Sequence, residues 1–205
     1  MGRQKNYERD NITRKAMEVF WRLGYHGTST QSLVDAMGVN RFSLYAEFGN
    51  KKALYEAALK LYEEEVVTYH LRSLESPEAG LIEMQDLFNA FANAAGATDS
   101  EMGCFVCNAA TDQAPYELGS RMFVHAYVMR ISAAFTHALN NARQRRSQLP
   151  DVNAVQEGHY LATLVVGIFV LLRAQMTPTV LHAAVASAQQ HLHYLTGQVD
   201  ESRAD

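Results

Sequence analysis

The sequence predicts an all-α protein made of a small three-helix head and a larger helical body. Long runs of apolar residues at helical spacing cover much of the 205 residues, and only four prolines interrupt them. No internal repeat or low-complexity stretch is visible. At 22.9 kDa the chain can bury a substantial core, and we expect two domains, residues 1–52 and residues 53–205.

The head is expected to begin with a helix that ends at Gly24. Its apolar residues recur at the 3.6-residue period, so that they can pack on the two helices that follow. These residues are Ile12, Ala16, Val19, Phe20 and Leu23. Thr30 is placed to cap a second helix, whose inward side carries Leu33, Ala36 and Met37.

A tight turn and another capped helix follow. Gly38 tolerates the positive φ of such a turn, and Asn40 can cap a helix that turns Leu44 and Phe48 inward. The other side of this helix carries Arg41, Phe42, Ser43 and Tyr45. Such side chains can donate to phosphates, reach base edges or contact a thymine methyl group. The pattern therefore predicts a helix-turn-helix that reads DNA.

The residues after this motif also favour an anionic partner. Asn50 can cap a further helix, and Lys51 and Lys52 lie at its start, where their charge opposes the helix dipole. Residues 1–52 hold nine Lys or Arg against five Asp or Glu, a net of +4, while residues 53–205 hold nine against 17, a net of −8. The total of −4 thus hides a basic head, and we expect its affinity for DNA to depend on salt.

The first quarter of the chain resembles the tetracycline-repressor-type (TetR) family of bacterial transcriptional regulators. The residues that match at that family's spacing are Phe20, Gly24, Gly27, Thr28, Ser29, Leu33, Gly38, Val39, Ser43, Leu44, Tyr45, Phe48, Lys51 and Leu54. The resemblance implies a homodimer whose variable C-terminal domain binds a small-molecule effector that controls DNA binding. We expect a repressor that is released from a palindromic operator in double-stranded DNA.

Carried over position by position, the resemblance implies a set of DNA contacts in the head. They fall on Thr30, Gln31, Asn40, Arg41, Phe42, Ser43, Tyr45 and Lys51. Glu47 departs from the family pattern, because many members have His or Tyr there and phosphate repels a carboxylate. We expect Glu47 to pair with Lys51, four residues later, and to orient that lysine.

The remaining helices can be placed coarsely. The helix capped by Asn50 is expected to run to about Tyr69, with Glu63, Glu64 and Glu65 as a solvated face. Further helices are expected over residues 81–95, 104–112, 115–146, 154–175 and 178–196. Candidates for the inward side of the longest are Met122, Phe123, His125, Tyr127 and Met129.

The last two helices are expected to form the dimer interface. Their apolar stripes consist of Leu161, Leu164, Val165, Ile168, Leu172, Leu181, Val185 and Leu192. A helix that is apolar on nearly every side must be covered on nearly every side, and a second subunit is a natural cover. The alternative is that both stripes serve the core of a single chain.

Aromatic and methionine side chains of the body are the candidates for an effector pocket. They are Phe88, Phe91, Met102, Phe105, Phe123, Tyr127 and Phe169. Effector sites between helices are mostly apolar, but ordinary core packing explains the same residues.

Cys104 and Cys107 are the only cysteines and form a CxxC pattern at the start of a predicted helix. A helix N-terminus lowers the pKa of a thiol, so a thiol-based sensor of oxidants or electrophiles is an alternative function. The other interpretation is that both thiols are small apolar core residues. Two cysteines and scattered histidines do not supply a zinc site, and we expect no metal and no cofactor.

An enzyme is not expected, because the eight histidines form no pattern with a nucleophile or metal partner. A helical adaptor that binds protein instead of DNA is a further alternative. Arg3, Lys5 and Arg9 precede no apolar run, which argues against a signal peptide. The most apolar segment, residues 160–172, is shorter than the ~20 residues of a spanning helix, so we expect a cytoplasmic protein without a membrane partner.

Overall fold

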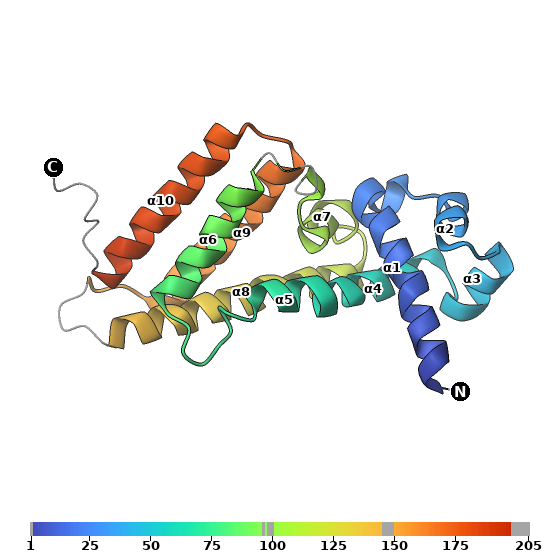
Figure 1. The fold of residues 1–205 in the computed structure, drawn as a ribbon, viewed down its shortest axis with the longest axis horizontal. Helices are drawn as coiled ribbons and strands as arrows, with labels where there is room; N and C mark the ends of the chain where they lie inside the picture. Colours follow the sequence, from blue (N-terminus) through green and yellow to red (C-terminus); the bar gives the residue numbers. More distant parts are fainter. Residues whose placement is uncertain (1, 96, 98–100, 145–149, 198–205) are drawn as a thin grey trace. The chain divides into compact units, whose positions relative to one another are not determined.

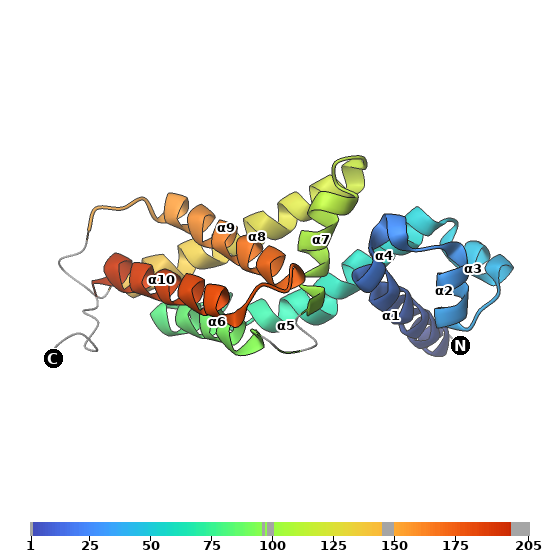
Figure 2. The ribbon, with the colours of Figure 1, turned by 90° about the horizontal axis from the view of Figure 1, so that it is seen from above.

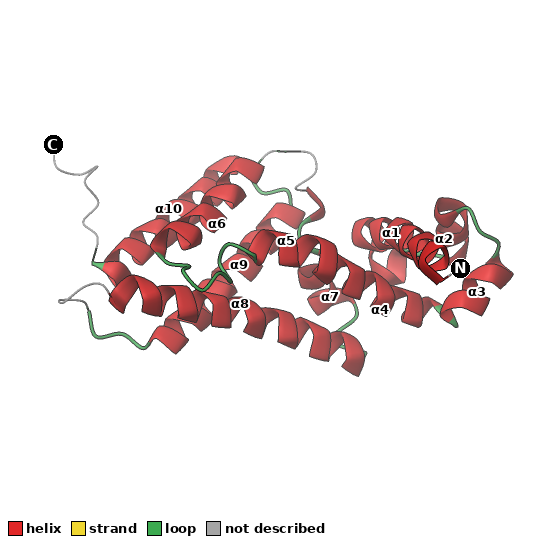
Figure 3. Ribbon diagram, turned by 60° about the horizontal axis from the view of Figure 1, so that its bottom comes forward, coloured by secondary structure: helices red, strands yellow, loops and turns green. Residues whose placement is uncertain are grey.

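The computed structural model describes residues 2–95, 97, 101–144 and 150–197, with side chains described from residue 9 onward. Every regular element in these residues is a helix, which confirms the all-α prediction (Figure 3). The chain forms two compact units: unit 1 comprises Met1–Tyr69 and Cys104–Val124, and unit 2 comprises His70–Gly103 and His125–Asp205. The predicted functional boundary at residue 52 stays a prediction.

Three helices at the start of unit 1 form the predicted helix-turn-helix head (Figure 1). They are α1 (Gly2–Gly27), α2 (Thr30–Met37) and α3 (Arg41–Phe48). Gly24, with φ +74°, breaks the regular helix of α1, as predicted. The cap of α2 is Ser29 instead of Thr30: the Ser29 hydroxyl accepts from the Ser32 N–H at 3.0 Å, and the Ser32 hydroxyl accepts from the Ser29 N–H at 3.1 Å. Thr30 is therefore the first helical residue.

The core of the head follows the predicted pattern in part, because Ile12 and Val19 are only half-buried and two further residues are exposed. Its buried apolar residues are Ala16, Met17, Phe20, Leu33, Met37, Leu44 and Phe48. Leu23 is 48% exposed and Ala36 is exposed, so both predictions of burial are wrong. On α1 the buried face instead includes Thr13 and Met17, one position away from the predicted stripe.

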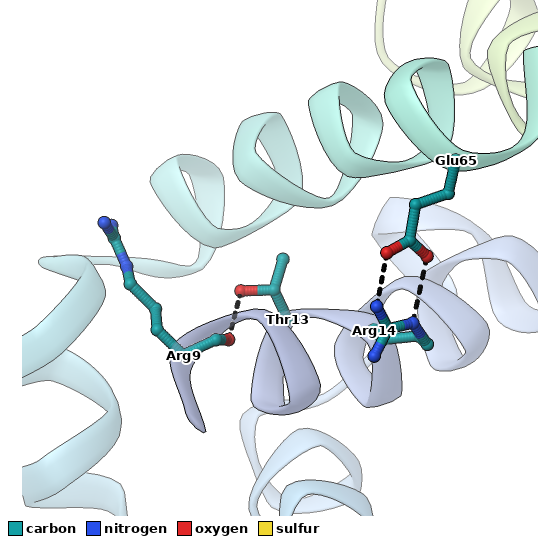
Figure 4. Close-up of polar contacts among 4 residues, drawn as sticks. All are labelled: Arg9, Thr13, Arg14 and Glu65. Carbon is teal, nitrogen blue, oxygen red and sulfur yellow. Dashed lines mark hydrogen bonds and ion pairs between the residues drawn. The ribbon is translucent and has the colours of Figure 1, made fainter. Parts of the chain in front are cut away.

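The helix capped by Asn50 continues past the head as predicted, but it contains a π-helical turn. It consists of α4 (Lys51–Tyr62), η1 (Glu63–Val67), which is a π-helical turn, and α5 (Thr68–Leu71). Glu65 of η1 is not only solvated, because the Arg14 guanidinium binds its carboxylate and ties η1 to α1 (Figure 4). The same hydrogen bond holds the pKa of Glu65 below its usual value.

Unit 1 is completed by α7 (Phe105–Asp112) and the first residues of α8 (Leu118–Gln144). The Phe105 ring lies edge-on to Tyr55, at 5.4 Å between centroids, and to Tyr62, at 5.8 Å. Tyr55 in turn contacts Phe20 at 5.0 Å and Tyr25 at 5.1 Å. These rings form an aromatic cluster that joins α1, α4 and α7 inside unit 1.

Two tyrosines of this cluster make the stability of the protein depend on pH. Burial raises the pKa of Tyr55 above its usual range, and burial together with the Cys104 thiol raises the pKa of Tyr62. In the unfolded chain both phenols ionise near pH ~10, so the folded state keeps protons that the unfolded state loses. We expect the free energy of unfolding to fall above about pH 10 by up to ~1.4 kcal/mol per pH unit for each tyrosine. Denaturant titrations across this range test it; a slope that is the same in Tyr55→Phe would contradict the assignment.

Unit 2 is a bundle in which α6 (Leu81–Ala94), α9 (Ala154–Arg173) and α10 (Pro178–Thr196) pack with the rest of α8 (Figure 1, Figure 2). Its core includes Phe88, Ile131, Phe135, Leu161 and Leu192. Of the predicted inward residues of α8, Tyr127 is buried, Phe123 is half-buried, and His125, Met122 and Met129 are exposed. The prediction for these last three is wrong.

The apolar helix α9 is 20 residues long, with a mean hydropathy of 1.6 over its best 18-residue window. By length and composition alone it is able to cross a membrane, whereas the sequence argument considered only its most apolar part, residues 160–172. Among the residues that the structure describes, it is the single helix that meets this criterion of length and composition. The core helix of a soluble protein meets the same criterion, and a third of this window is buried.

Candidate nucleic-acid interface

The helix α3 is held in place by caps at both ends. The Asn40 side-chain oxygen accepts from the Ser43 N–H at 2.8 Å, and Gly38 and Gly49 adopt φ of +69° and +82° at the turns on either side. Three consecutive side chains, those of Arg41, Phe42 and Ser43, are exposed. Phe42 is 84% exposed, which is unusual for a large apolar side chain. The outer side of α3 thus presents a donor, a ring and a hydroxyl to solvent.

Tyr45 is fixed by neighbours on two helices. Its hydroxyl lies 3.0 Å from the Thr30 hydroxyl at the start of α2, and the Arg41 guanidinium lies over its ring at 5.6 Å. The Thr30 hydrogen bond, together with Arg41, lowers the pKa of Tyr45. The Gln31 amide donates to Asp35 at 2.7 Å along the exposed side of α2. The predicted contact residues of α2 and α3 therefore lie on one connected surface.

The start of α4 adjoins this surface. Tyr25, Tyr45, Gly49, Asn50, Lys51 and Lys52 line an open depression there. The Asn50 side-chain oxygen accepts from the Ala53 N–H at 2.9 Å and caps α4. A helix N-terminus favours anions because its free N–H groups and its dipole face the ligand. The depression therefore has the chemistry of a phosphate site.

The two lysines of the depression have different partners. The Lys51 ammonium lies 4.3 Å from the centre of the Tyr25 ring, a cation–π contact. The Lys52 ammonium is bound by Glu117 at 2.6 Å, and Glu56 lies 4.0 Å away. The sequence predicts an anionic partner for both lysines. For Lys52 that partner is the Glu117 carboxylate of the same chain.

The predicted pair of Glu47 and Lys51 is wrong. The Glu47 carboxylate binds the Nε of Arg9 at 3.2 Å, and the Arg9 guanidinium also lies over the Phe48 ring at 5.3 Å. The i, i+4 rule applies within one helix, whereas α3 ends at Phe48 and α4 begins at Lys51. Arg9 neutralises the carboxylate that departs from the family pattern.

The residues predicted for the effector pocket fall into separate groups. In unit 2, Phe91 lies against Phe88 at 6.3 Å and against Phe169 at 5.1 Å. Tyr127 and Met102 belong to the same unit. Phe105 belongs instead to the aromatic cluster of unit 1, and Phe123 to the segment of α8 in that unit. The pocket stays a prediction.

Seven of the eight residues predicted for the dimer interface are buried inside the single chain. They are Leu161, Val165, Ile168, Leu172, Leu181, Val185 and Leu192. Leu164 is half-buried. Because α10 packs on both α6 and α9, the apolar stripes face the core of unit 2 and are not available to a second subunit. The burial agrees with the alternative that both stripes serve the core of a single chain, and the dimer itself stays a prediction.

Both cysteines are reduced and buried, Cys104 with 1% and Cys107 with 5% of its surface exposed. Cys104 occupies the residue position before α7, without a side-chain cap, and its thiol interacts with the Tyr62 hydroxyl. Reaction with oxidants requires an accessible thiolate, so this burial favours a packing role.

The head and its exposed α3 surface define the class of this protein, a helix-turn-helix regulator that binds DNA. Residues 12–58 match the family model of the bacterial regulatory proteins of the tetR family. The HTH-type transcriptional regulator YezE of Bacillus subtilis (strain 168) is 30% identical over 145 residues, which are 71% of this chain and 75% of YezE. The chain therefore belongs to the tetR family.

Two further comparisons agree with this assignment. The HTH-type transcriptional repressor ComR of Escherichia coli (strain K12) is 38% identical over 115 residues, 56% of this chain and 55% of ComR. The solved structure of the TetR family transcriptional regulator CifR, a cysteine mutant complexed with 26-bp double-strand operator DNA, superposes with a TM-score of 0.76. Its sequence is 26% identical, and the match covers 89% of this chain and 95% of CifR.

Proposed function

We propose that this regulator is a transcriptional repressor that binds a palindromic operator as a homodimer. The observation that carries the proposal is the connected surface of Thr30, Arg41, Phe42, Ser43 and Tyr45, next to the open depression at Lys51. Arginine and hydroxyl side chains on a recognition helix contact base edges, and a lysine at a helix N-terminus contacts phosphate. The relative ComR is named a repressor, and CifR is bound to operator DNA in its solved structure.

The dimer is proposed to use the outer faces of α9 and α10 in place of their buried stripes. The exposed residues of these faces are Tyr160, Thr163, Gly167 and Val170 on α9, and Ala183, Ala186, Gln190 and Tyr194 on α10. The His191 ring contacts both Tyr160, at 5.2 Å, and Tyr194, at 6.4 Å, so that the two helices share one surface. Small residues let helices approach closely, and a second copy of the chain places two heads about one DNA turn, ~34 Å, apart.

A small-molecule effector in the body is proposed to release the operator. The aromatic group of Phe88, Phe91 and Phe169 is the part of the predicted pocket that unit 2 brings together. Such a ligand changes DNA affinity only if it binds the DNA-competent and incompetent arrangements of the dimer unequally. A regulator of this kind has no catalytic role and works in the cytoplasm, where its operator is.

The proposal is tested by selecting a duplex from a random-sequence pool and titrating the enriched site at several salt concentrations. We expect a palindromic site bound by two chains, with log K falling against log salt by about 0.9 for each phosphate neutralised. Arg41→Ala should weaken binding by about 10- to 100-fold and relax the sequence preference. Lys60→Ala removes an equal charge from an exposed part of α4 and is the control. If the selection enriches no sequence, the proposal of a repressor is overturned and a helical adaptor that binds protein is favoured.

A further inference from the structure

We propose that Asp112 of α7 is a positioning residue for DNA binding, which acts through Tyr25 to hold Lys51 at the operator phosphate. The proposal rests on the function proposed above. Asp112 is not among the residues that line the depression next to α3. All three residues belong to unit 1, although 61 positions separate Lys51 from Asp112.

The first step is the bond between Asp112 and the backbone after the break in α1. Gly24 has φ +74° and ψ 171°, and the N–H of the next residue, Tyr25, donates to the Asp112 carboxylate. A Cβ on Gly24 would lie 3.0 Å from an oxygen of Asp112, so glycine permits both the backbone angle and the close approach. The second oxygen of Asp112 lies 4.0 Å from the His26 ring nitrogen. The carboxylate thus fixes where the chain turns at Tyr25.

The second step is the contact between Tyr25 and Lys51. The Tyr25 ring lies parallel to Phe20 at 6.3 Å and edge-on to Tyr55 at 5.1 Å, and its position is set by these buried rings and by the Asp112 bond. The Lys51 ammonium lies 4.3 Å from the centre of this ring. Burial lowers the pKa of Lys51, and the negative charge of Asp112 opposes that lowering. Tyr25 therefore determines where this cation is presented.

If Asp112 acted only through its charge, its removal would change operator affinity in the direction opposite to that expected for a positioning residue. A carboxylate near the DNA surface repels phosphate, so removing it should tighten operator binding. If Asp112 acts by positioning, its removal should weaken binding. Lys51 has a flexible side chain, and without the Tyr25 ring held in place it loses more entropy when it binds a phosphate. The direction of the change therefore separates the two effects.

The experiment titrates the selected operator with full-length variants over a range of salt concentrations. Asp112→Ala is expected to bind about tenfold more weakly, with a salt slope lower by about two, one phosphate for each head of the dimer. Asp112→Asn retains an oxygen that can accept from Tyr25, and it should bind as tightly as wild type or more tightly. Glu117→Gln removes a negative charge from the same part of unit 1 without touching the Tyr25 N–H, and it should not weaken binding.

A double substitution tests whether Asp112 acts through the lysine. In a Lys51→Gln background, Asp112→Ala should cost little further affinity. An equal loss with and without Lys51 would overturn the proposal, as would an Asp112→Ala variant that binds as tightly as wild type. If Asp112→Ala does not fold by circular dichroism, Asp112→Ser takes its place. Failure of the wild type to select any operator would instead overturn the proposed function and this inference with it.

Discussion

Replacing Phe20 with alanine is expected to lower the free energy of unfolding by about 3 to 5 kcal/mol. Phe20 is fully buried and contacts both Tyr25 and Tyr55, so the truncation leaves a cavity at the centre of the aromatic cluster of unit 1. Aromatic pairs contribute beyond their buried area, and two of them are lost. Urea unfolding followed by circular dichroism measures the change.

Phe42→Ala is the matched control for this prediction. The same side chain is removed from the same head, but Phe42 is 84% exposed and contributes little to the core. We expect its stability to stay within about 0.5 kcal/mol of wild type, while operator affinity falls. A large loss of stability in Phe42→Ala, or none in Phe20→Ala, would show that the head is packed differently from the structure described here.

Gly158→Ala is expected to destabilise unit 2 by about 1 to 3 kcal/mol, against the trend of helix propensity. Alanine normally gains up to ~1 kcal/mol over glycine inside a helix. At Gly158, however, a Cβ would lie 2.2 Å from the Thr136 hydroxyl oxygen and 2.7 Å from the Ser132 carbonyl oxygen. The second clash involves backbone, so α9 and α8 must move apart.

Gly167 of the same helix provides the comparison, because a Cβ there meets no atom of the chain within 4 Å. Because Gly167 also lies on the face proposed for the dimer, this comparison is made on dilute, monomeric protein, where Gly167→Ala should leave stability unchanged or raise it by up to ~1 kcal/mol. Thermal unfolding of both variants at equal protein concentration measures the difference. If the two alanines have the same effect, the close approach of α8 and α9 at Gly158 does not exist.

The sequence predicted those features of the head that depend on neighbouring residues. Asn40 and Asn50 cap the helices as expected, Gly38 occupies the predicted positive-φ position, and the regular helix of α1 is broken at Gly24. The outward side of α3 follows from the position of Leu44, because helical spacing places Phe42, two residues earlier, on the opposite side. Local rules decide all of these features.

The features that sequence reasoning missed depend on residues far apart in the chain. Glu47 pairs with Arg9, and Lys52 with Glu117, 65 positions later. Tyr25 supports Lys51 only because the break at Gly24 turns it toward α4, and no local pattern carries that information. The apolar stripe of α9 predicts a second subunit as its cover, whereas the structure covers it within the chain. Apolar spacing shows which face of a helix is buried and not which element buries it.

Because two separate segments of the chain make up unit 1, only some chimeras of this regulator with related proteins keep that unit whole. The head is encoded by the first residues of the chain, but residues 104–124 belong to the same unit, where Phe105 covers the rings of Tyr55 and Tyr62. A chimera cut once, after residue 52 or residue 69, would leave those rings without their cover. Transplanting this DNA specificity into another body therefore takes two exchanged segments, and single-crossover hybrids of this chain should fold poorly.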